Sequence, residues 1–250
     1  MREVCLVIPC YNEAERLRGD LVLDFLESRG SASLCFVNDG SSDGTLKIVE
    51  TLRMRDPARV MVLSLARNSG KAEAVRQGVA HAAALRRFAF IGYWDADLST
   101  PLSELDGLLA AFDVNPGCLL AMGSRVKRLG SDIERNGARH YLGRIFSTFA
   151  SQVLRLPVYD SQCGAKVFRS ELSGVLFGDR FITRWLFDVE MLARLRNHLG
   201  RDAVLAAAIE VPLGAWKEMG GSKLRIAHVV KVPFELLKIR AYYRSRLPSR

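Results

Sequence analysis

The first half of the chain alternates short apolar runs with longer segments of mixed polarity, and this alternation restricts the fold more than any other feature. Strands are expected at residues 4–8, 34–37, 60–65, 88–94 and 119–123. Helices are expected at residues 13–26, 45–55, 71–85 and 102–112. Such an order predicts an α/β protein with a mostly parallel central sheet flanked by helices on both faces.

The second half is less regular. Helices are expected at residues 137–154 and 186–199, a strand at 166–168, and a buried strand or helix at 203–211. Residues 222–246 read as a helical tail that is broken near Pro233. The chain has no internal repeat and no linker rich in proline, glycine or serine, so the simplest organisation is one domain with a substrate-facing second half.

Ligands of parallel sheets bind beyond the carboxyl ends of the strands. One of these ends carries Asp95 and Asp97, directly after the apolar run of residues 88–94. In an extended chain the two carboxylates point to the same side and repel each other unless a cation lies beside them. A hard divalent ion that also holds a diphosphate suits this pair, whereas an acidic turn closing the strand is the alternative.

Three other strand ends carry candidate ligands. Tyr11 offers an aromatic face for a base, and Glu13 is either a hydrogen-bond acceptor for a ligand or a simple helix-initiating anion. Asp39 can accept from a uracil N–H or a ribose hydroxyl; a capped loop would explain Asp43 but leaves Asp39 without a partner. Lys71, at the start of a helix, can face a phosphate, although both the P-loop and the G-x-G-x-x-G patterns are absent.

The balance of charge points to an anionic partner. The net charge is +9 and the pI is near 9.6, which suits nucleic acid, a phosphate-bearing ligand or an acidic membrane surface. The five cysteines lack a C-x-x-C pair, which argues against a disulfide framework and a zinc site. We expect no signal peptide, and no apolar stretch reaches the roughly 20 residues that span a bilayer.

Four motifs in order carry a family resemblance: Pro9-x-Tyr11-Asn12-Glu13, Asn38-Asp39-Gly40-Ser41-x-Asp43-x-Thr45, Asn68-x-Gly70-Lys71 and Asp95-Ala96-Asp97. The chain resembles the family 2 inverting glycosyltransferases of the GT-A fold. Residues 160–168, 184–190 and 216–223 resemble the polyprenyl-phosphate sugar transferases among them, most closely the dolichyl-phosphate β-glucosyltransferase group.

The resemblance implies a donor site in the first half of the chain. In it the backbone around Pro9, with Tyr11 and Glu13, frames the base, and Asp39 contacts the nucleotide. Asp95 and Asp97 would hold Mg²⁺ or Mn²⁺ on the donor diphosphate, beside Lys71. Ser99 stands where mannosyl-transferring relatives carry a glutamine, which favours a UDP-sugar as donor.

The resemblance also implies an acceptor site. Asp188, or its rival Asp160, is expected near the acceptor as a general base. A phosphate acceptor is already largely dianionic at pH 7, however, so Asp188 can instead orient a cation or a sugar hydroxyl. The candidate phosphate-binding cations are Arg125, Arg139, Lys166 and Lys223. The candidate contacts to the donor sugar are Gln162 and Trp216, for which packing in the core is an equally good explanation.

These expectations divide the chain into a GT-A domain, residues 1–221, and a basic amphipathic tail, residues 222–250. The domain comprises a nucleotide-binding half, residues 1–124, and an acceptor-side half, residues 125–221. The tail fits either an anionic membrane interface or a packed helix with a cationic outer face. We therefore expect a cytoplasmic protein held on the inner face of a membrane, directly or by a separate membrane partner.

The lead hypothesis is transfer of a hexose, glucose from UDP-glucose, onto a polyprenyl or dolichyl phosphate. Transfer to another lipid or to a cell-surface glycan precursor is the alternative within the same reaction class. A non-catalytic basic module that binds nucleic acid would fit the charge. We do not expect nucleic acid as a partner, because the sequence has no helix-turn-helix, zinc-finger or RNA-binding aromatic motif.

Overall fold

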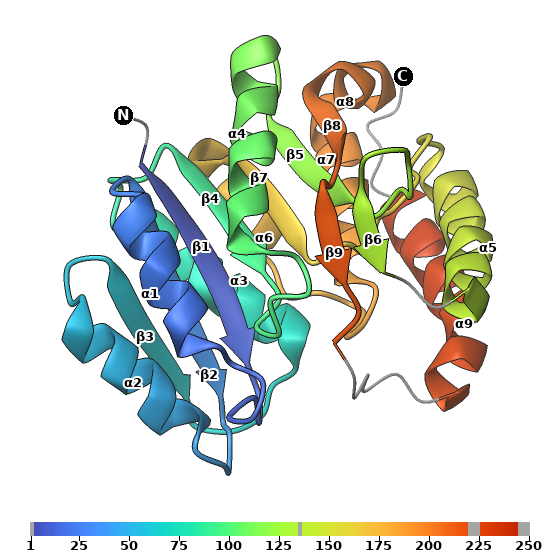
Figure 1. Cartoon of the computed structure of the whole chain (residues 1–250). Coiled ribbons are helices and arrows are strands. Elements are labelled where there is room, and N and C mark those ends of the chain that lie inside the picture. The colour runs from blue at the N-terminus through green and yellow to red at the C-terminus, as the bar shows by residue number, and fades with distance from the viewer. Residues whose placement is uncertain (1–2, 135–136, 220–225, 245–250) are drawn as a thin grey trace.

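The computed structural model describes residues 3–134, 137–219 and 226–244, and of residues 137–142, 226–230 and 244 it describes the backbone only. Its centre is a seven-stranded sheet in the order β3-β2-β1-β4-β7-β5-β8 (Figure 1). The strands are β1 (Val4–Cys10), β2 (Ala32–Asp39), β3 (Val60–Leu65), β4 (Phe90–Trp94), β5 (Leu120–Ser124), β7 (Ala165–Arg169) and β8 (Ala208–Pro212). All pair in parallel except β7, which runs antiparallel to both β4 and β5. The prediction of a mostly parallel α/β sheet is therefore confirmed.

Helices cover both faces of the sheet because its strands are apolar on both sides. In β1, for example, Leu6 packs in one core layer and Val7 in the other. One face is covered by α1 (Gly19–Ser28), α2 (Thr45–Arg55) and α4 (Leu105–Val114). The other is covered by α3 (Lys71–Ala84), α6 (Ser173–Phe177) and α7 (Phe187–Leu199), with α8 (Arg201–Ala207) beside α7.

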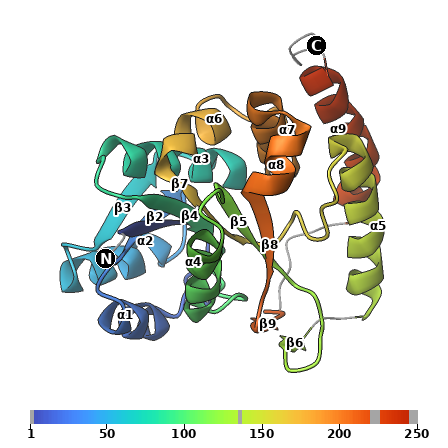
Figure 2. The ribbon, with the colours of Figure 1, turned by 90° about the horizontal axis from the view of Figure 1, so that it is seen from above.

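Two smaller units complete the fold. A second sheet pairs β6 (Asp132–Glu134) in parallel with β9 (Ala215–Lys217), and short 3₁₀ helices occupy Leu102–Glu104 and Ser170–Leu172. Helices α5 (Gly137–Leu154) and α9 (Ile226–Arg244) lie side by side at one end of the molecule (Figure 2). The end of α9 is packed, since Leu236, Ile239 and Tyr243 are buried.

Several predicted boundaries are wrong for physical reasons. The first helix begins at Gly19 rather than at residue 13, because residues 14–16 form only a turn, in which the Leu17 N–H donates to the Glu13 carbonyl. The backbone N–H groups of Glu13 and Ala14 donate to the side chains of Thr45 and Asp43. These bonds hold residues 13–14 against the neighbouring loop. Residues 203–211 contain both alternatives, a helix followed by strand β8. The expected break in the tail is also wrong, because α9 continues through Pro233.

None of the helices in the described ranges combines the length and the apolar character that crossing a membrane requires.

Candidate functional site

The candidate site begins where β4 ends, at the carboxyl ends of the parallel strands, where the loops after β1, β2 and β3 also lie. The Lys71 Nζ lies 2.5 Å from Asp95 Oδ1, so the predicted phosphate-binding lysine and the first predicted metal ligand form an ion pair. Burial works against the charged form of Lys71, but Asp95, Asp188 and Asp97 outweigh it and raise the pKa of the lysine. The pair joins the carboxyl end of β4 to the first residue of α3.

Gly164 lies directly behind the Asp95 carboxylate. The Asp95 N–H donates to the Gly164 carbonyl at 3.0 Å, and a β-carbon placed on Gly164 would lie 2.0 Å from Asp95 Oδ2. Only a glycine leaves room for the carboxylate at this approach. The residues before β7 therefore fix the position of an acid that follows β4.

Asp97 lies two residues further on, in a turn. Its Oδ1 accepts from the Ser99 N–H at 3.0 Å, and the Leu98 N–H donates to the Asp95 carbonyl at 3.2 Å. The acidic stretch is thus a turn, as the alternative interpretation held, and it also places both carboxylates at the sheet edge.

Asp39 joins two of the loops at this edge. Its two carboxylate oxygens accept from the backbone N–H groups of Ser69 and Gly70, at 2.7 and 2.8 Å. The expectation that Asp39 lacks a protein partner is therefore wrong. The carboxylate is buried and fixes the loop that leads into Lys71.

The loop after β1 is held against the loop after β2. Asn12 N–H donates to Ser41 Oγ at 3.1 Å. The predicted base-framing residues differ in exposure: Tyr11 is exposed, Pro9 is half-buried in β1, and Glu13 is buried with its carboxylate 2.6 Å from Arg16 Nη2. Among these three, Tyr11 has the most surface to offer to a ligand.

Arg125, whose charge the Asp95 carboxylate also stabilises, forms a two-pronged ion pair with Asp160. Arg125 Nε and Nη2 each lie 2.7 Å from one oxygen of Asp160, and the guanidinium lies 5.4 Å from the centre of the Trp216 ring. Burial opposes ionisation of Asp160, but Arg125 outweighs it and lowers the pKa of Asp160 to about 2. The carboxylate of Glu210 on β8 accepts from the backbone N–H of Asp160 at 2.6 Å and holds the loop in place.

Lys166 and Asp188 form a second buried pair. Lys166 is 0 % exposed, and its Nζ lies 2.7 Å from Asp188 Oδ1 and 2.5 Å from the Cys163 carbonyl. The Tyr93 hydroxyl donates to the same Asp188 oxygen, and burial followed by the Asp188 charge raises the pKa of this tyrosine. The expectation that Lys166 contacts an acceptor phosphate is wrong, because its ammonium is enclosed in the protein and donates to Asp188 and to the Cys163 carbonyl.

The remaining predicted residues are placed less completely. Gln162 is half-buried, and its Nε2 atom, like the hydroxyls of Ser124 and Ser161, has no hydrogen-bond partner among the described residues. These polar atoms lie on the segments that also carry Arg125 and Asp160. The side chain of Arg139 and the whole of Lys223 fall outside the described part of the chain.

Sequence reasoning missed Arg184, whose guanidinium lies against Gly70. A β-carbon at Gly70 would be 3.4 Å from both Nε and Nη2 of Arg184. The motif around residues 184–190 contains this arginine, but nothing in the sequence indicates that it reaches the loop before α3. Gly164 and Glu210 were missed for the same reason, since their partners are distant in the chain.

The acidic pair fits a divalent metal that the substrate helps to bind. No group of three or more His, Cys, Asp or Glu side chains suited to a metal occurs among the described residues. Asp95 and Asp97 offer hard carboxylate oxygens, and Mg²⁺ or Mn²⁺ in such sites completes its shell with phosphate oxygens and water. The packing of Asp95 on Gly164 fixes the position of one of the two candidate ligands.

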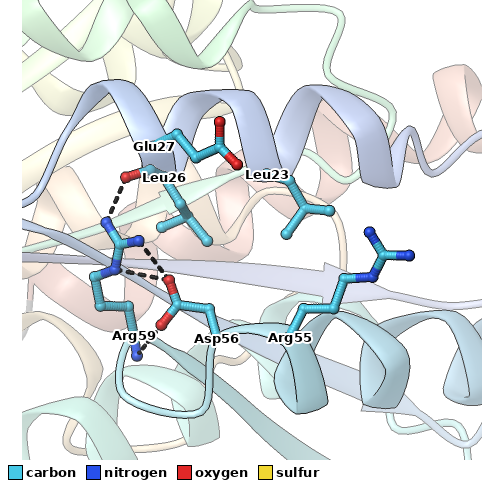
Figure 3. A pocket seen from close by; sticks show the side chains of 6 residues that line it. All are labelled: Leu23, Leu26, Glu27, Arg55, Asp56 and Arg59. Atoms are coloured by element: carbon cyan, nitrogen blue, oxygen red, sulfur yellow. Dashed lines mark hydrogen bonds and ion pairs between the residues drawn. The ribbon is translucent and has the colours of Figure 1, made fainter.

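A hollow of about 370 Å³ lies elsewhere, between α1 and the loop that follows α2 (Figure 3). Its wall includes the Arg59–Asp56 ion pair, and Arg59 also donates to the Leu26 carbonyl. This hollow lies beside the amino end of β3, whereas Asp95 follows the carboxyl end of β4, so the hollow is not part of the candidate site.

Together, the fold and the acidic pair Asp95 and Asp97 at the carboxyl ends of the parallel strands define a nucleotide-sugar transferase of the GT-A type. The profile of glycosyl transferase family 2 matches residues 5–177, and the chain belongs to this family. It is a hexosyltransferase by homology.

Among its relatives, a dolichyl-phosphate beta-glucosyltransferase of Trichomonas vaginalis is 31 % identical, covering 96 % of this chain and 72 % of the relative. The dolichyl-phosphate beta-glucosyltransferase of Mus musculus is 30 % identical, covering 89 % and 70 %. These proteins support the resemblance inferred from residues 160–168, 184–190 and 216–223.

Solved structures share the fold at low sequence identity. Glucosyl-3-phosphoglycerate synthase of Mycobacterium tuberculosis, solved with Mn²⁺, UDP and phosphoglyceric acid, has a TM-score of 0.69 at 18 % identity, covering 99 % of this chain and 80 % of its own. Mannosyl-3-phosphoglycerate synthase of Rubrobacter xylanophilus has a TM-score of 0.72 at 17 % identity, covering 100 % and 77 %.

Proposed function

We propose that the protein transfers glucose from UDP-glucose to a polyprenyl phosphate at a membrane surface, with inversion at the anomeric carbon. One observation carries the donor half of the proposal: the Lys71–Asp95 ion pair is seated on Gly164, beside the loop that Asp39 fixes. This arrangement places a cation and two acids where the ligands of parallel sheets bind.

In the proposed reaction an oxygen of the acceptor phosphate forms a bond to C1 of glucose. The bond between C1 and the β-phosphate oxygen breaks, and UDP leaves with the bonding electron pair. Lys71 stabilises the charge that grows on the diphosphate. A bound Mg²⁺ or Mn²⁺, held by Asp95 and Asp97, supplies further neutralisation of that charge. The exposed ring of Tyr11 offers a surface on which the uracil can stack.

The state of the two candidate bases favours a phosphate acceptor over a hydroxyl. A general base works best with a pKa near the working pH, whereas Arg125 lowers the pKa of Asp160 to about 2. Asp188 is buried and already accepts from Lys166 and Tyr93 through one oxygen. A phosphate monoester needs no deprotonation near pH 7, because its second pKa is about 6.

The acceptor side offers a cation and a polar wall. Arg125 is our candidate for contact with the acceptor phosphate; two of its nitrogens are held by Asp160, and its guanidinium lies 5.4 Å from the centre of the Trp216 ring. Gln162 lies on the same loop as Asp160, and its Nε2 atom, which has no hydrogen-bond partner in the described part of the chain, is our candidate donor to a sugar hydroxyl. These contacts support positioning of the two substrates rather than proton transfer.

A transfer assay tests the donor and the acceptor together. The purified chain is given UDP-glucose, UDP-galactose or GDP-mannose, with and without a short-chain prenyl phosphate, in Mn²⁺ and after chelation. We expect transfer from UDP-glucose only when metal and prenyl phosphate are present. Transfer to diacylglycerol or to a glycan with no reaction on the phosphate would contradict the acceptor.

The acidic pair is tested separately with Asp97→Asn, which preserves shape and removes charge. We expect loss of most transfer activity, and a loss of the rise in melting temperature that UDP with Mn²⁺ gives the wild type. Asp202→Asn, at an exposed acid of α8, is the matched control. Full activity of Asp97→Asn would refute the metal role of this residue.

Attachment to an anionic membrane completes the proposal. Helices α5 and α9 carry large apolar side chains that are more than half exposed, interleaved on α9 with exposed cations. These residues are Ile145, Phe149, Phe234 and Leu237, with Lys231, Lys238 and Arg240. Apolar insertion combined with attraction to anionic lipid is the usual mode of interfacial helices.

Vesicle flotation tests the attachment. We expect the wild type to float with vesicles containing phosphatidylglycerol and less with phosphatidylcholine alone. The double variant Phe234→Glu/Leu237→Glu removes two apolar groups that are 72 % and 57 % exposed, and should bind at least about tenfold more weakly. Val114→Glu, at an exposed valine of α4, should bind like the wild type. Equal flotation of both variants at low salt would end this part of the proposal.

A further inference from the structure

The segment between α6 and α7 brings an unassigned arginine to the donor side of the site. Arg184 is exposed, and its guanidinium lies 3.4 Å from the point where a β-carbon would stand on Gly70, the residue before Lys71. Within the described residues, no ion pair or hydrogen bond engages this guanidinium. An arginine that is held beside a phosphate-facing lysine and has no anionic partner is suited to a ligand's negative charge.

The backbone on both sides of Arg184 is fixed from within. The fully buried carboxylate of Glu190 accepts from the N–H groups of Ile182 and Thr183, at 3.0 and 3.3 Å. On the other side, Leu186 and Phe187 are buried in the core. The side chain that reaches Gly70 therefore starts from an anchored segment.

The anchor itself is a buried charge network. Arg194 lies 3.0 Å from Glu190 and donates to the carbonyls of Leu176, Asp179 and Arg180. The Tyr243 hydroxyl of α9 donates to Glu190 at 2.7 Å. Such a network is costly to disturb and holds the segment in one conformation.

A diphosphate bound near Gly70 would need a cation besides Lys71, and Arg184 can supply it. Lys71 is already paired with Asp95, so the negative charge of a diphosphate calls for a further cation. The backbone of Gly70 has φ = +92°, a conformation that suits glycine, and its missing side chain leaves the space beside the guanidinium open. Arginine can hold two phosphoryl oxygens at once, which lysine cannot do.

We propose that Arg184 binds the diphosphate of the nucleotide-sugar donor, opposite Lys71 across Gly70. This inference rests on the proposed donor site, and it assigns to that site a ligand from the second half of the chain. Closure of the donor site then depends on the α6–α7 segment as well as on the loops of the nucleotide half.

Calorimetric binding of UDP, in Mn²⁺, tests the assignment, with uridine followed by ligand-observed NMR. Arg184→Ala should bind UDP about 10- to 100-fold more weakly and bind uridine as the wild type does. Arg184→Lys should recover part of the loss. Arg180→Ala, at an exposed arginine of the same segment, is the matched control and should bind UDP normally.

The outcomes separate the two levels of inference. If the wild type itself binds no UDP, the proposed donor site fails. If the wild type binds UDP and Arg184→Ala binds it equally well, only the role of Arg184 is refuted. Equal losses for UDP and uridine would make the residue structural. A higher KM for prenyl phosphate with unchanged UDP binding would assign Arg184 to the acceptor and overturn the proposal.

Discussion

Gly164→Ala is the sharpest test of whether Gly164 positions the Asp95 carboxylate, because it leaves both Asp95 and Asp97 in the chain. The new methyl group would lie 2.0 Å from Asp95 Oδ2, where ordinary contact begins at 3.4 Å. The carboxylate must therefore move by about 1.4 Å, or rotate away. Metal ligands tolerate deviations of only about 0.2 Å, and a misplacement of about 1 Å in an active site can cost about 100-fold in rate.

We expect Gly164→Ala to lose about 100-fold in kcat/KM for transfer, and most of the stabilisation by UDP with Mn²⁺. Overpacking of this kind costs about 1–3 kcal/mol of stability, so the protein should remain folded. Urea unfolding followed by circular dichroism checks this point. Gly174→Ala is the matched control, because no described atom lies within 4 Å of a β-carbon there.

The reasoning is refuted if folded Gly164→Ala keeps its activity within threefold of the wild type. It is also refuted if Gly174→Ala loses as much activity as Gly164→Ala, because the effect would then not come from the Asp95 carboxylate.

Three further outcomes follow from the buried polar groups. The pKa of Asp160 is about 2 in the folded protein, against 3.8 for an ordinary aspartate, so its stabilising effect is complete above about pH 4 and is lost as the pH falls towards 2. In urea unfolding, the free energy of unfolding of the wild type should therefore fall by about 2 kcal/mol more than that of Asp160→Asn between pH 4 and pH 2. Asp39→Asn turns one carboxylate oxygen that accepts a backbone N–H into a donor and should cost about 1–3 kcal/mol, with weaker UDP binding; unchanged values would contradict the role of Asp39 in the loop. Lys166→Met leaves Asp188 buried beside an apolar group and should cost about 3–5 kcal/mol in the same unfolding experiment, whereas a loss below 1 kcal/mol would show that the pair is not desolvated.

Much of the sheet could be predicted because each parallel strand is a local apolar run. Residues 45–55, 60–65 and 137–154 have the predicted type and bounds. The antiparallel direction of β7 could not be predicted, because pairing with β4 and β5 is a long-range property. Strands β6 and β9 have three residues each, too few for a periodic pattern.

The site was predicted in its residue types but not in its pairings. Asp39 is bonded to residues thirty and thirty-one positions later, and nothing local reveals them. The burial of Lys166 could have been foreseen, since period-two alternation places it on the same face as Phe168, which is part of the core. Arg184 reaches Gly70 only through the packing of α6 and α7, which the sequence does not encode locally.

The antiparallel strand β7 has a consequence for how the protein is made. The residues that seat Asp95, Gly164 among them, directly precede β7 and emerge from the ribosome long after the acid itself. Parallel pairing of β1, β2, β3 and β4 can begin as soon as those segments are synthesised. Asp95 lacks its contact with Gly164, however, until β7 has joined the sheet. A nascent chain that stops short of Gly164 therefore carries both aspartates without the residue that packs against Asp95, and the position of this acid is fixed only in the second half of translation.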